Sequence, residues 1–200
     1  MGSDSTSLVA FDDPSHLVKI SEPFYMARYE VTQEEWTELM GENPSLFEGS
    51  ELPVEQVSWN DAQEFVNRLN EKENTDKYRL SSEAEWEYAC RAGTTTKYYF
   101  GDDESELGEY AWYYDNSDHM THPVGQKKPN PWELYDMHGN VWEWCQDRYH
   151  KSHRKTSDGT PADTHALEAF NSSGLVLHGG GWVNYAGKCR SAYRSSFNPD

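Results

Sequence analysis

Residues 134–144 read Leu134-Tyr135-Asp136-Met137-His138-Gly139-Asn140-Val141-Trp142-Glu143-Trp144, a run that combines aromatic side chains with carboxylates, a glycine and an asparagine. Other aromatic runs, separated by Gly, Pro, Asn and Asp, lie at Lys97–Phe100 and Tyr110–Tyr114, and Pro131–Tyr135 overlaps the beginning of residues 134–144. Aromatic clusters interrupted by turn-forming residues are typical of short strands and loops rather than of helices. We therefore predict that the second half of the chain forms short strands and long ordered loops.

The composition predicts a folded chain in spite of its strong negative charge. The 200 residues include 17 Lys and Arg against 35 Asp and Glu, which gives a formal net charge of −18. This charge opposes binding to nucleic acid or to an anionic membrane surface. Disordered acidic segments carry a similar charge but lack aromatic residues, whereas this chain has 8 Trp, 13 Tyr and 7 Phe. A chain of this length buries roughly 70% of its surface on folding, which is enough for a core.

The cysteines and apolar runs leave the cellular compartment unassigned. Cys90, Cys145 and Cys189 are odd in number and have no Cys-x-x-Cys spacing, so neither a disulfide framework nor a zinc knuckle is indicated. No apolar run approaches the roughly 20 residues that span a membrane. The first residues lack the basic and apolar regions of a signal peptide.

Regular structure is expected mainly in the first half of the chain. Apolar residues recur at helical spacing over residues 60–72, with Ser58 or Asn60 as the N-cap. Thr32-x-x-Glu35 and Ser82-x-x-Glu85 are capping boxes that begin helices ending near Gly41 and Gly93. Strands are expected within residues 23–31 and 175–177, and a surface loop over residues 148–164. With no internal repeat and no linker, residues 1–200 are expected to form a single domain.

Five segments, in this order, resemble the sulfatase-modifying-factor, or formylglycine-generating-enzyme, family. The resemblance implies an α+β, C-type-lectin-like fold with small antiparallel sheets, two main helices and much irregular structure. It also implies that residues 1–200 lack an edge strand at each end and come from a longer bacterial or archaeal protein. The segments are Phe24-Tyr25-Met26 with Tyr29-Glu30-Val31-Thr32, Pro53-Val54 with Val57-Ser58-Trp59-Asn60-Asp61-Ala62, Tyr78–Ala89, Leu134–Trp144, and Gly179-Gly180-Gly181-Trp182 with Cys189–Arg194.

The resemblance leaves enzymatic activity uncertain. Formylglycine-generating enzymes hold copper with two cysteines in the segment after the glycine run, and soft Cu(I) needs thiolate ligands. Counted forward from Gly179–Gly181, those positions fall on Asn184 and Cys189; counted backward from Arg194, Cys189 matches neither. Either count leaves at most one thiolate, so Cys189 is the one catalytic candidate and copper is expected only if the chain is an enzyme. We expect Cys90 and Cys145 to be core residues.

A related branch of the family contains iron-dependent sulfoxide synthases, whose metal histidines come from an added helical domain. The present chain has two His-x-x-His pairs, His119 with His122 and His150 with His153. Both pairs lie in polar sequence without a fixed acidic third ligand, so we expect them to be solvated loop histidines.

Residues 134–144 also carry a predicted calcium site. By resemblance, the ligands are the side chains of Asp136 and Glu143 and the backbone carbonyls of Gly139 and Val141. Ca²⁺ takes six to eight hard oxygens, and an irregular loop can direct carboxylates and carbonyls to one point. The site would be structural. The alternative is that Asp136 and Glu143 only cap turns and pair with arginines.

The C-terminal segment predicts a ligand-binding face. In lectin-fold relatives this segment lines the ligand site, and retroelement-diversified variable proteins randomise it. Aromatic, Asn and Ser side chains together resemble the composition of antibody paratopes. The alternative is that these residues only cover an edge of the core. The candidate residues are Trp182, Asn184, Tyr185, Tyr193, Ser195, Phe197 and Asn198.

Two functions follow from these observations. The first is a non-catalytic module that binds a protein or a small molecule on its C-terminal face, and a retroelement-diversified variable protein is one form of it. The second is a formylglycine-generating or related metal-dependent oxidoreductase acting on a protein cysteine. The incomplete cysteine pair favours the first.

Overall fold

The computed structural model describes residues 1–2, 16–150 and 174–200. It has a three-stranded antiparallel sheet of order β1-β2-β3, built from Glu143–Arg148, Leu175–His178 and Ser195–Phe197. Around it lie three α-helices, α1 (Gln33–Met40), α2 (Trp59–Glu73) and α3 (Glu83–Arg91). Two 3₁₀ helices, η1 (Glu104–Glu109) and η2 (Ala186–Lys188), complete the regular structure of the described residues. The predicted α+β fold with small sheets and long irregular segments is confirmed.

The helices begin where their capping residues predict. Each α-helix has a capping box, in which the N-cap side chain accepts from the N3 amide and the N3 carboxylate accepts from the N-cap amide. Ser58, rather than Asn60, caps α2. The C-cap of α3 is Ala92, which adopts a left-handed conformation (φ 45°) directly before Gly93. The helix thus ends just before Gly93, as the glycine predicts.

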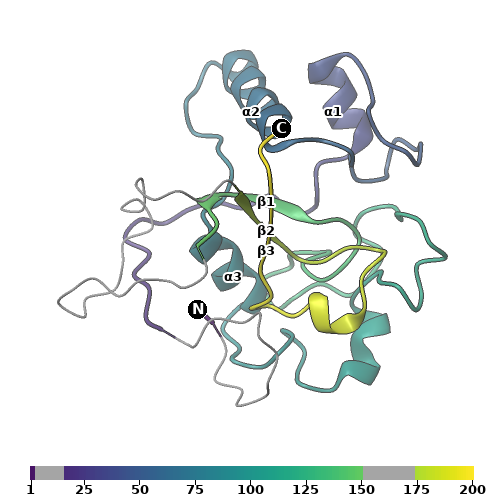
Figure 1. Cartoon of the computed structure of the whole chain (residues 1–200). Helices are drawn as coiled ribbons and strands as arrows, with labels where there is room; N and C mark the ends of the chain where they lie inside the picture. Colours follow the sequence, from purple (N-terminus) through teal and green to yellow (C-terminus); the bar gives the residue numbers. More distant parts are fainter. Residues whose placement is uncertain (3–15, 151–173) are drawn as a thin grey trace.

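The helices lie on different sides of the sheet (Figure 1). Helix α3 contacts β1 and β2, while α1 and α2 pack against each other, with the Trp36 and Phe65 rings stacked at 5.1 Å. The Trp59 indole, in the first turn of α2, donates to the carbonyl of Cys145 in β1 at 3.0 Å. The chain's C-terminal end lies beside α2, since the Asn60 amide donates to the Pro199 carbonyl.

The predicted strand within residues 23–31 is wrong, whereas the one at residues 175–177 is confirmed as β2. In the part of the chain that is described, residues 17–27 have no backbone partner, and pairing begins only where the Arg28 carbonyl accepts from Tyr135. The aromatic residues there favour a strand, but among the described residues no strand pairs with them. Most of the predicted 148–164 loop lies outside the described residues.

The core consists largely of aromatic side chains from loops. One buried cluster joins α3 to the sheet and to residues 134–137, and a second lies under η1 and η2. The rings of Phe100 and Tyr110 stack at 4.1 Å, and Tyr99 stacks on His138 at 4.6 Å. Large flat side chains contribute much buried area per residue, which allows a small amount of regular structure to enclose a core.

Gly139 lies at the closest approach between two loops. A Cβ built on it would lie 2.2 Å from the Trp112 carbonyl oxygen, and its φ is +85°. Both features exclude a side chain, because a backbone atom cannot be moved aside cheaply and L residues rarely adopt this φ.

We expect Gly139→Ala to lower the free energy of unfolding by at least ~2 kcal/mol. Gly187→Ala is the matched control, because a Cβ there meets no atom within 4 Å and φ lies outside the left-handed region; it should change stability by less than ~0.5 kcal/mol. Urea denaturation followed by tryptophan fluorescence measures both. Equal stability of the two variants would contradict the close contact.

Candidate functional site

The loop that leads into β1 has an unusual backbone. Glu133, Asp136, Gly139 and Asn140 all have positive φ, between 54° and 85°. Residues other than glycine enter this region only at a cost, which the surrounding structure must offset. The loop is therefore held by contacts outside itself.

Asn140 supplies most of those contacts. Its amide donates to the Trp112 carbonyl (2.7 Å), and its carbonyl accepts from the Trp182 amide (2.8 Å). Its Nδ2 donates to Glu30 Oε2 (2.7 Å) and to the His122 carbonyl (3.1 Å), while its Oδ1 accepts from the His122 amide (3.0 Å). This fully buried side chain thus joins segments from the beginning, middle and end of the chain.

Three carboxylates lie close to this junction. Asp136 Oδ2 accepts from the Gly125 amide at 2.7 Å, but its buried Oδ1 has no hydrogen-bond partner within the described ranges. Burial raises the pKa of Asp136 to about 6 and, together with the charge of Asp136, the pKa of Glu143 to about 7. Burial also raises the pKa of Glu30, and repulsion from the charges of Asp136 and Glu143 raises it further. A cation would relieve this accumulation of negative charge.

The structure brings several of the predicted calcium ligands together. A Cβ built at Gly179 would lie 3.6 Å from the Val141 carbonyl oxygen and 3.7 Å from Glu143 Oε1, so both oxygens face the same space. Asp136 interacts electrostatically with Glu143. Among the residues that the structure describes, no group of three or more His, Cys, Asp or Glu is arranged to hold a metal. A calcium site here depends on backbone carbonyls as well as carboxylates and stays a prediction.

The C-terminal candidates divide into two groups. Trp182, Asn184 and Tyr185 precede η2, whereas Ser195, Phe197 and Asn198 belong to β3 or follow it toward the end beside α2 (Figure 1). In the first group Tyr185 is exposed and packs against Tyr114, with ring centroids 4.6 Å apart.

In the second group Phe197 is 65% exposed. Tyr193 is only 8% exposed, so its ring offers little surface to a ligand. Ligand binding by either group of residues stays a prediction.

The three cysteines are buried and free. Cys90 and Cys145 lie in the core cluster around Trp86, as predicted. Cys189 is fully buried, and burial raises the pKa of its thiol to about 12. Its sulfur packs so closely on Gly180 that a Cβ there would lie 2.8 Å away. Cys189 is therefore a neutral packing residue in this conformation.

Two of the four paired histidines differ from the expected solvated state: His122, and His150, whose Nε2 is buried without a hydrogen-bond partner among the described residues. His122 is half-buried, stacks on Trp112 at 3.8 Å, and its Nε2 lies 2.8 Å from the Ser117 carbonyl. His122 thus belongs to the segments that the hydrogen bonds of Asn140 join, and it is not a solvated histidine. His119 is exposed beside Tyr114, and His153 lies outside the described residues.

A buried ion-pair network joins α3 to β2 and to the segment before β3. Glu83 in α3 pairs with both Arg194 and His178, and His178 stacks on Trp86 at 4.6 Å. Burial alone would raise the pKa of Glu83, but the bonds from His178 and Arg194 outweigh it and lower the pKa to about 2. The network joins α3 to the C-terminal segment without an open side for a substrate.

Sequence reasoning missed two residues of the site. Asn140 and Glu30 both lie in segments that carry the family resemblance, but the sequence assigns neither of them a role in a site. The one available signal for Glu30 was an acidic residue inside an aromatic run. Its contacts with Asn140 and Val141 span more than 100 residues, and no local pattern reports pairs so distant.

The family comparison covers the entire chain. The model of the sulfatase-modifying factor enzyme 1-like domain matches residues 1–200. The chain belongs to this family. The five short sequence segments predicted this membership, and the prediction is confirmed.

Relatives within the family have different names and lengths. "Chaperone protein LppX" of Paenibacillus barcinonensis is 32% identical over 98% of this chain and 81% of the relative. The formylglycine-generating enzyme of Streptomyces coelicolor is also 32% identical, over 74% of this chain. That match spans about half (48%) of the length of the Streptomyces protein.

Solved structures of the family share the fold. PvdO from Pseudomonas aeruginosa superposes with a TM-score of 0.84 at 28% identity, over 100% of this chain and 84% of that one. Treponema denticola variable protein 1 superposes with a TM-score of 0.72 at 33% identity, over 86% and 79%. Within the described ranges, this family member has no helix of the length and apolarity needed to cross a membrane.

The Glu83 network predicts a pH dependence of stability. The pKa of Glu83 is about 2 in the folded protein and about 4.5 when unperturbed, so between these values the unfolded chain binds more protons. The contribution of Glu83 is complete above pH 4.5 and is lost as the pH falls toward 2. Glu83→Gln removes the buried carboxylate that pairs with Arg194 and should cost about 3 kcal/mol at pH 7.

Chemical denaturation at several pH values tests this expectation. The stability difference between parent and Glu83→Gln should shrink as the pH falls from 4.5 to 2. Glu38→Gln is the control, because its ion pair with Lys72 is exposed and solvent screens such a pair, so this substitution should change stability little. A difference that does not change with pH would show that Glu83 is not held ionised.

Proposed function

We propose that this chain is a non-catalytic binding module of the sulfatase-modifying-factor family. The state of Cys189 carries the proposal: it is the single cysteine in the segment after the glycine run, and it is buried with the pKa of its thiol raised to about 12. Copper-dependent oxidation of a cysteine needs an accessible pair of thiolates to hold Cu(I). Asn184 lies at the other position where the family resemblance places a copper-binding cysteine, and its side chain offers only an amide.

The residues present therefore do not fit copper. Cys90 and Cys145 cannot complete the pair, because both are buried in the core cluster around Trp86 and burial raises the pKa of each thiol. We derive no oxidation step for this chain.

The relatives support a binding role. One relative is named a chaperone and one solved neighbour a variable protein, and neither name describes an oxidase. By analogy we infer that the present chain binds a protein or a small molecule. The net charge of −18 opposes a nucleic-acid partner.

The exposed aromatic residues near the C-terminus are the surface that we assign to this binding. Tyr185 and Val183 are exposed beside the half-buried Trp182, and Tyr114 extends the aromatic surface from another segment. Rigid aromatic side chains bury large contact areas at low cost in conformational entropy.

A peptide-oxidation assay separates the two functions. The protein is incubated with Cu(I), oxygen and a reductant in the presence of a Cys-x-Pro-x-Arg peptide, and the peptide mass is measured. We expect no change, and Cys189→Ser should behave as the parent does. Appearance of the mass of the cysteine-derived aldehyde with the parent, and its absence with Cys189→Ser, would establish the enzymatic function instead.

We further propose that a structural Ca²⁺ binds at the loop 136–143. The unpartnered Asp136 Oδ1 and the oxygens of Val141 and Glu143 beside Gly179 support it, because hard oxygens suit this ion. Asp136, Glu143 and the carbonyls of Gly139 and Val141 would hold it. The ion would neutralise the buried carboxylates and fix the path of the loop.

Chelation tests the calcium proposal. EDTA should lower the Tm by about 5 °C or more, because an ion that binds only the folded state stabilises it. In Asp136→Asn the response should disappear, while Asp115→Asn, which changes an exposed carboxylate, should retain it. Calorimetric titration of the chelated protein with Ca²⁺ gives the direct readout. An identical Tm with and without chelator would contradict the site.

A further inference from the structure

Glu30 is a buried carboxylate without a cationic partner among the described residues. It is 9% exposed, and no Lys, Arg or His within the described ranges forms an ion pair with it. Asp136 and Glu143 lie close enough to repel its charge. Since buried charges in proteins are paired or coordinate metals, the charge of Glu30 calls for a cation that the side chains do not supply.

The other buried glutamates show the contrast. All three belong to α3, and each has a basic side chain within 3 Å or in direct ion pairing. Burial of a carboxylate is thus compensated everywhere in the described structure except at Glu30. The pairs are Glu83 with Arg194, Glu85 with Arg79 and Glu87 with Arg91.

The hydrogen bonds of Glu30 act on the loop predicted to bind calcium. Its Oε1 accepts from the Val141 amide at 3.1 Å, and its Oε2 accepts from Asn140 Nδ2 at 2.7 Å. Both oxygens therefore act as acceptors, which suits an ionised carboxylate. The carbonyl oxygen of the same Val141 faces the space beside Gly179, together with Glu143 Oε1. Glu30 thus fixes the amide side of a residue whose carbonyl is a predicted ligand.

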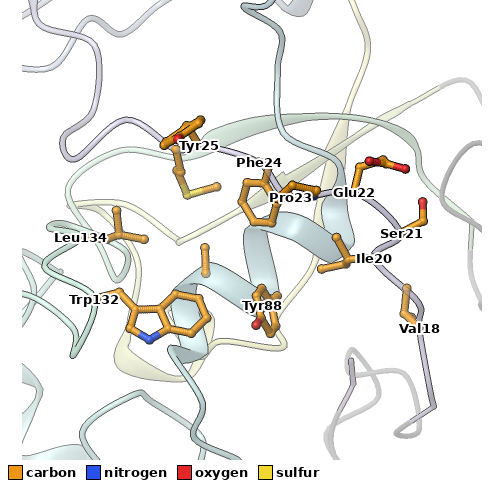
Figure 2. Close-up of a pocket in the computed structure, with 12 residues that line it drawn as sticks. Val18, Ile20, Ser21, Glu22, Pro23, Phe24, Tyr25, Tyr88, Trp132 and Leu134 are labelled. Atoms are coloured by element: carbon orange, nitrogen blue, oxygen red, sulfur yellow. The ribbon is translucent and has the colours of Figure 1, made fainter.

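The segment that carries Glu30 is itself anchored on both sides. Before it, the Arg28 carbonyl accepts from the Tyr135 amide at 3.0 Å, and after it the Val31 carbonyl accepts from the Val54 amide at 2.9 Å. Further upstream the segment lines a pocket of about 630 Å³ against α3, where the rings of Phe24 and Tyr88 lie 6.5 Å apart (Figure 2). Glu30 therefore has a fixed position from which to orient the loop.

A separate observation points to the ion itself. Asp136 is 1% exposed, and its Oδ1 has no hydrogen-bond partner in the part of the chain that is described. Within the same part, the carboxylates of Glu30, Asp136 and Glu143 do not form a metal-binding group by themselves. Glu30 therefore acts on the ion through its charge and through Val141, and not as a direct ligand.

We propose that Glu30 is a positioning residue of the Ca²⁺ site at the loop 136–143. It holds Val141 so that its carbonyl faces the ion, and it supplies a third negative charge that attracts the ion. This inference rests on the proposed Ca²⁺ site, whose ligands do not include Glu30. Residues outside the ligand set commonly orient the ligands of a metal.

The charge contribution has a measurable signature. The attraction between Glu30 and an ion is proportional to the charge of the ion. A loss of one carboxylate should therefore weaken a trivalent ion more than a divalent one. A role in geometry alone would weaken both ions by the same factor.

Terbium luminescence measures both affinities. Trp86 Cζ2 lies 3.5 Å from a Cβ built at Gly179, beside the oxygens of Val141 and Glu143, so its indole can sensitise a bound Tb³⁺. The chelated full chain is titrated with Tb³⁺ under tryptophan excitation, and Ca²⁺ is then added to displace it. We expect Glu30→Gln to weaken Ca²⁺ binding about tenfold and Tb³⁺ binding about thirtyfold, because the effect scales with ion charge.

Two further variants separate charge from position. Glu30→Asp keeps the charge but is one methylene shorter, so it cannot reach both Val141 and Asn140. It should weaken both ions by the same factor, about threefold or more, and keep the ratio of the two affinities. Glu87→Gln is the matched control, because Glu87 is also buried but is paired with Arg91; both affinities should stay within about twofold of the parent's. Thermal melts in Ca²⁺ verify that each variant is folded.

The outcomes distinguish this inference from the calcium proposal. A parent protein that shows neither Tb³⁺ luminescence nor Ca²⁺ binding by calorimetry would contradict the site and, with it, the role of Glu30. A parent that binds both ions, with unchanged affinities in Glu30→Gln and Glu30→Asp, would overturn the role of Glu30 alone. Equal weakening of both ions by Glu30→Gln would refute the charge contribution. If Glu30→Gln does not fold, Glu30→Asp decides, since parent-like affinities there would refute the proposal.

Discussion

The hydrogen bonds of Asn140 hold together the part of this structure that has the least regular secondary structure. One buried side chain and its backbone satisfy partners in Glu30, Trp112, His122 and Trp182. A buried polar group that loses its partners costs far more than a single hydrogen bond contributes. The loops are therefore mutually dependent, and the left-handed conformations of the 133–140 segment persist because these distant contacts outweigh their local cost.

Aromatic packing joins the remaining loops to the sheet and to α3. The three short strands of the sheet form few backbone hydrogen bonds, so the loops must bury area through Trp, Tyr and Phe side chains. Stacked ring pairs run from Tyr98 through Phe100 to Tyr110. Where a loop backbone passes another, as at Gly139 and Trp112, only glycine leaves the required space.

The negative charge of the chain has separate local consequences. Glu83 is buried but paired with Arg194 and His178, and the pKa of its carboxyl is low. Asp136 and Glu143 are also buried, but no cationic side chain among the described residues lies close enough to lower their pKa values. The pKa of each carboxyl is therefore raised. The same residue types thus act as a stabilising ion pair in one place and as an electrostatic cost in another.

The sequence by itself determined the local features: the capping boxes that begin α1, α2 and α3, the strand at 175–177, the family and its fold. These depend on residues close together in the chain. Only the tertiary structure decided that residues 23–31 form no strand, that Cys189 is buried, that Glu30 joins Asn140, and that the aromatic residues of 20–26, α3 and Trp132 enclose a pocket. Each of these depends on which distant segments meet, and pairing, burial and electrostatic coupling between such segments leave no local pattern in the sequence.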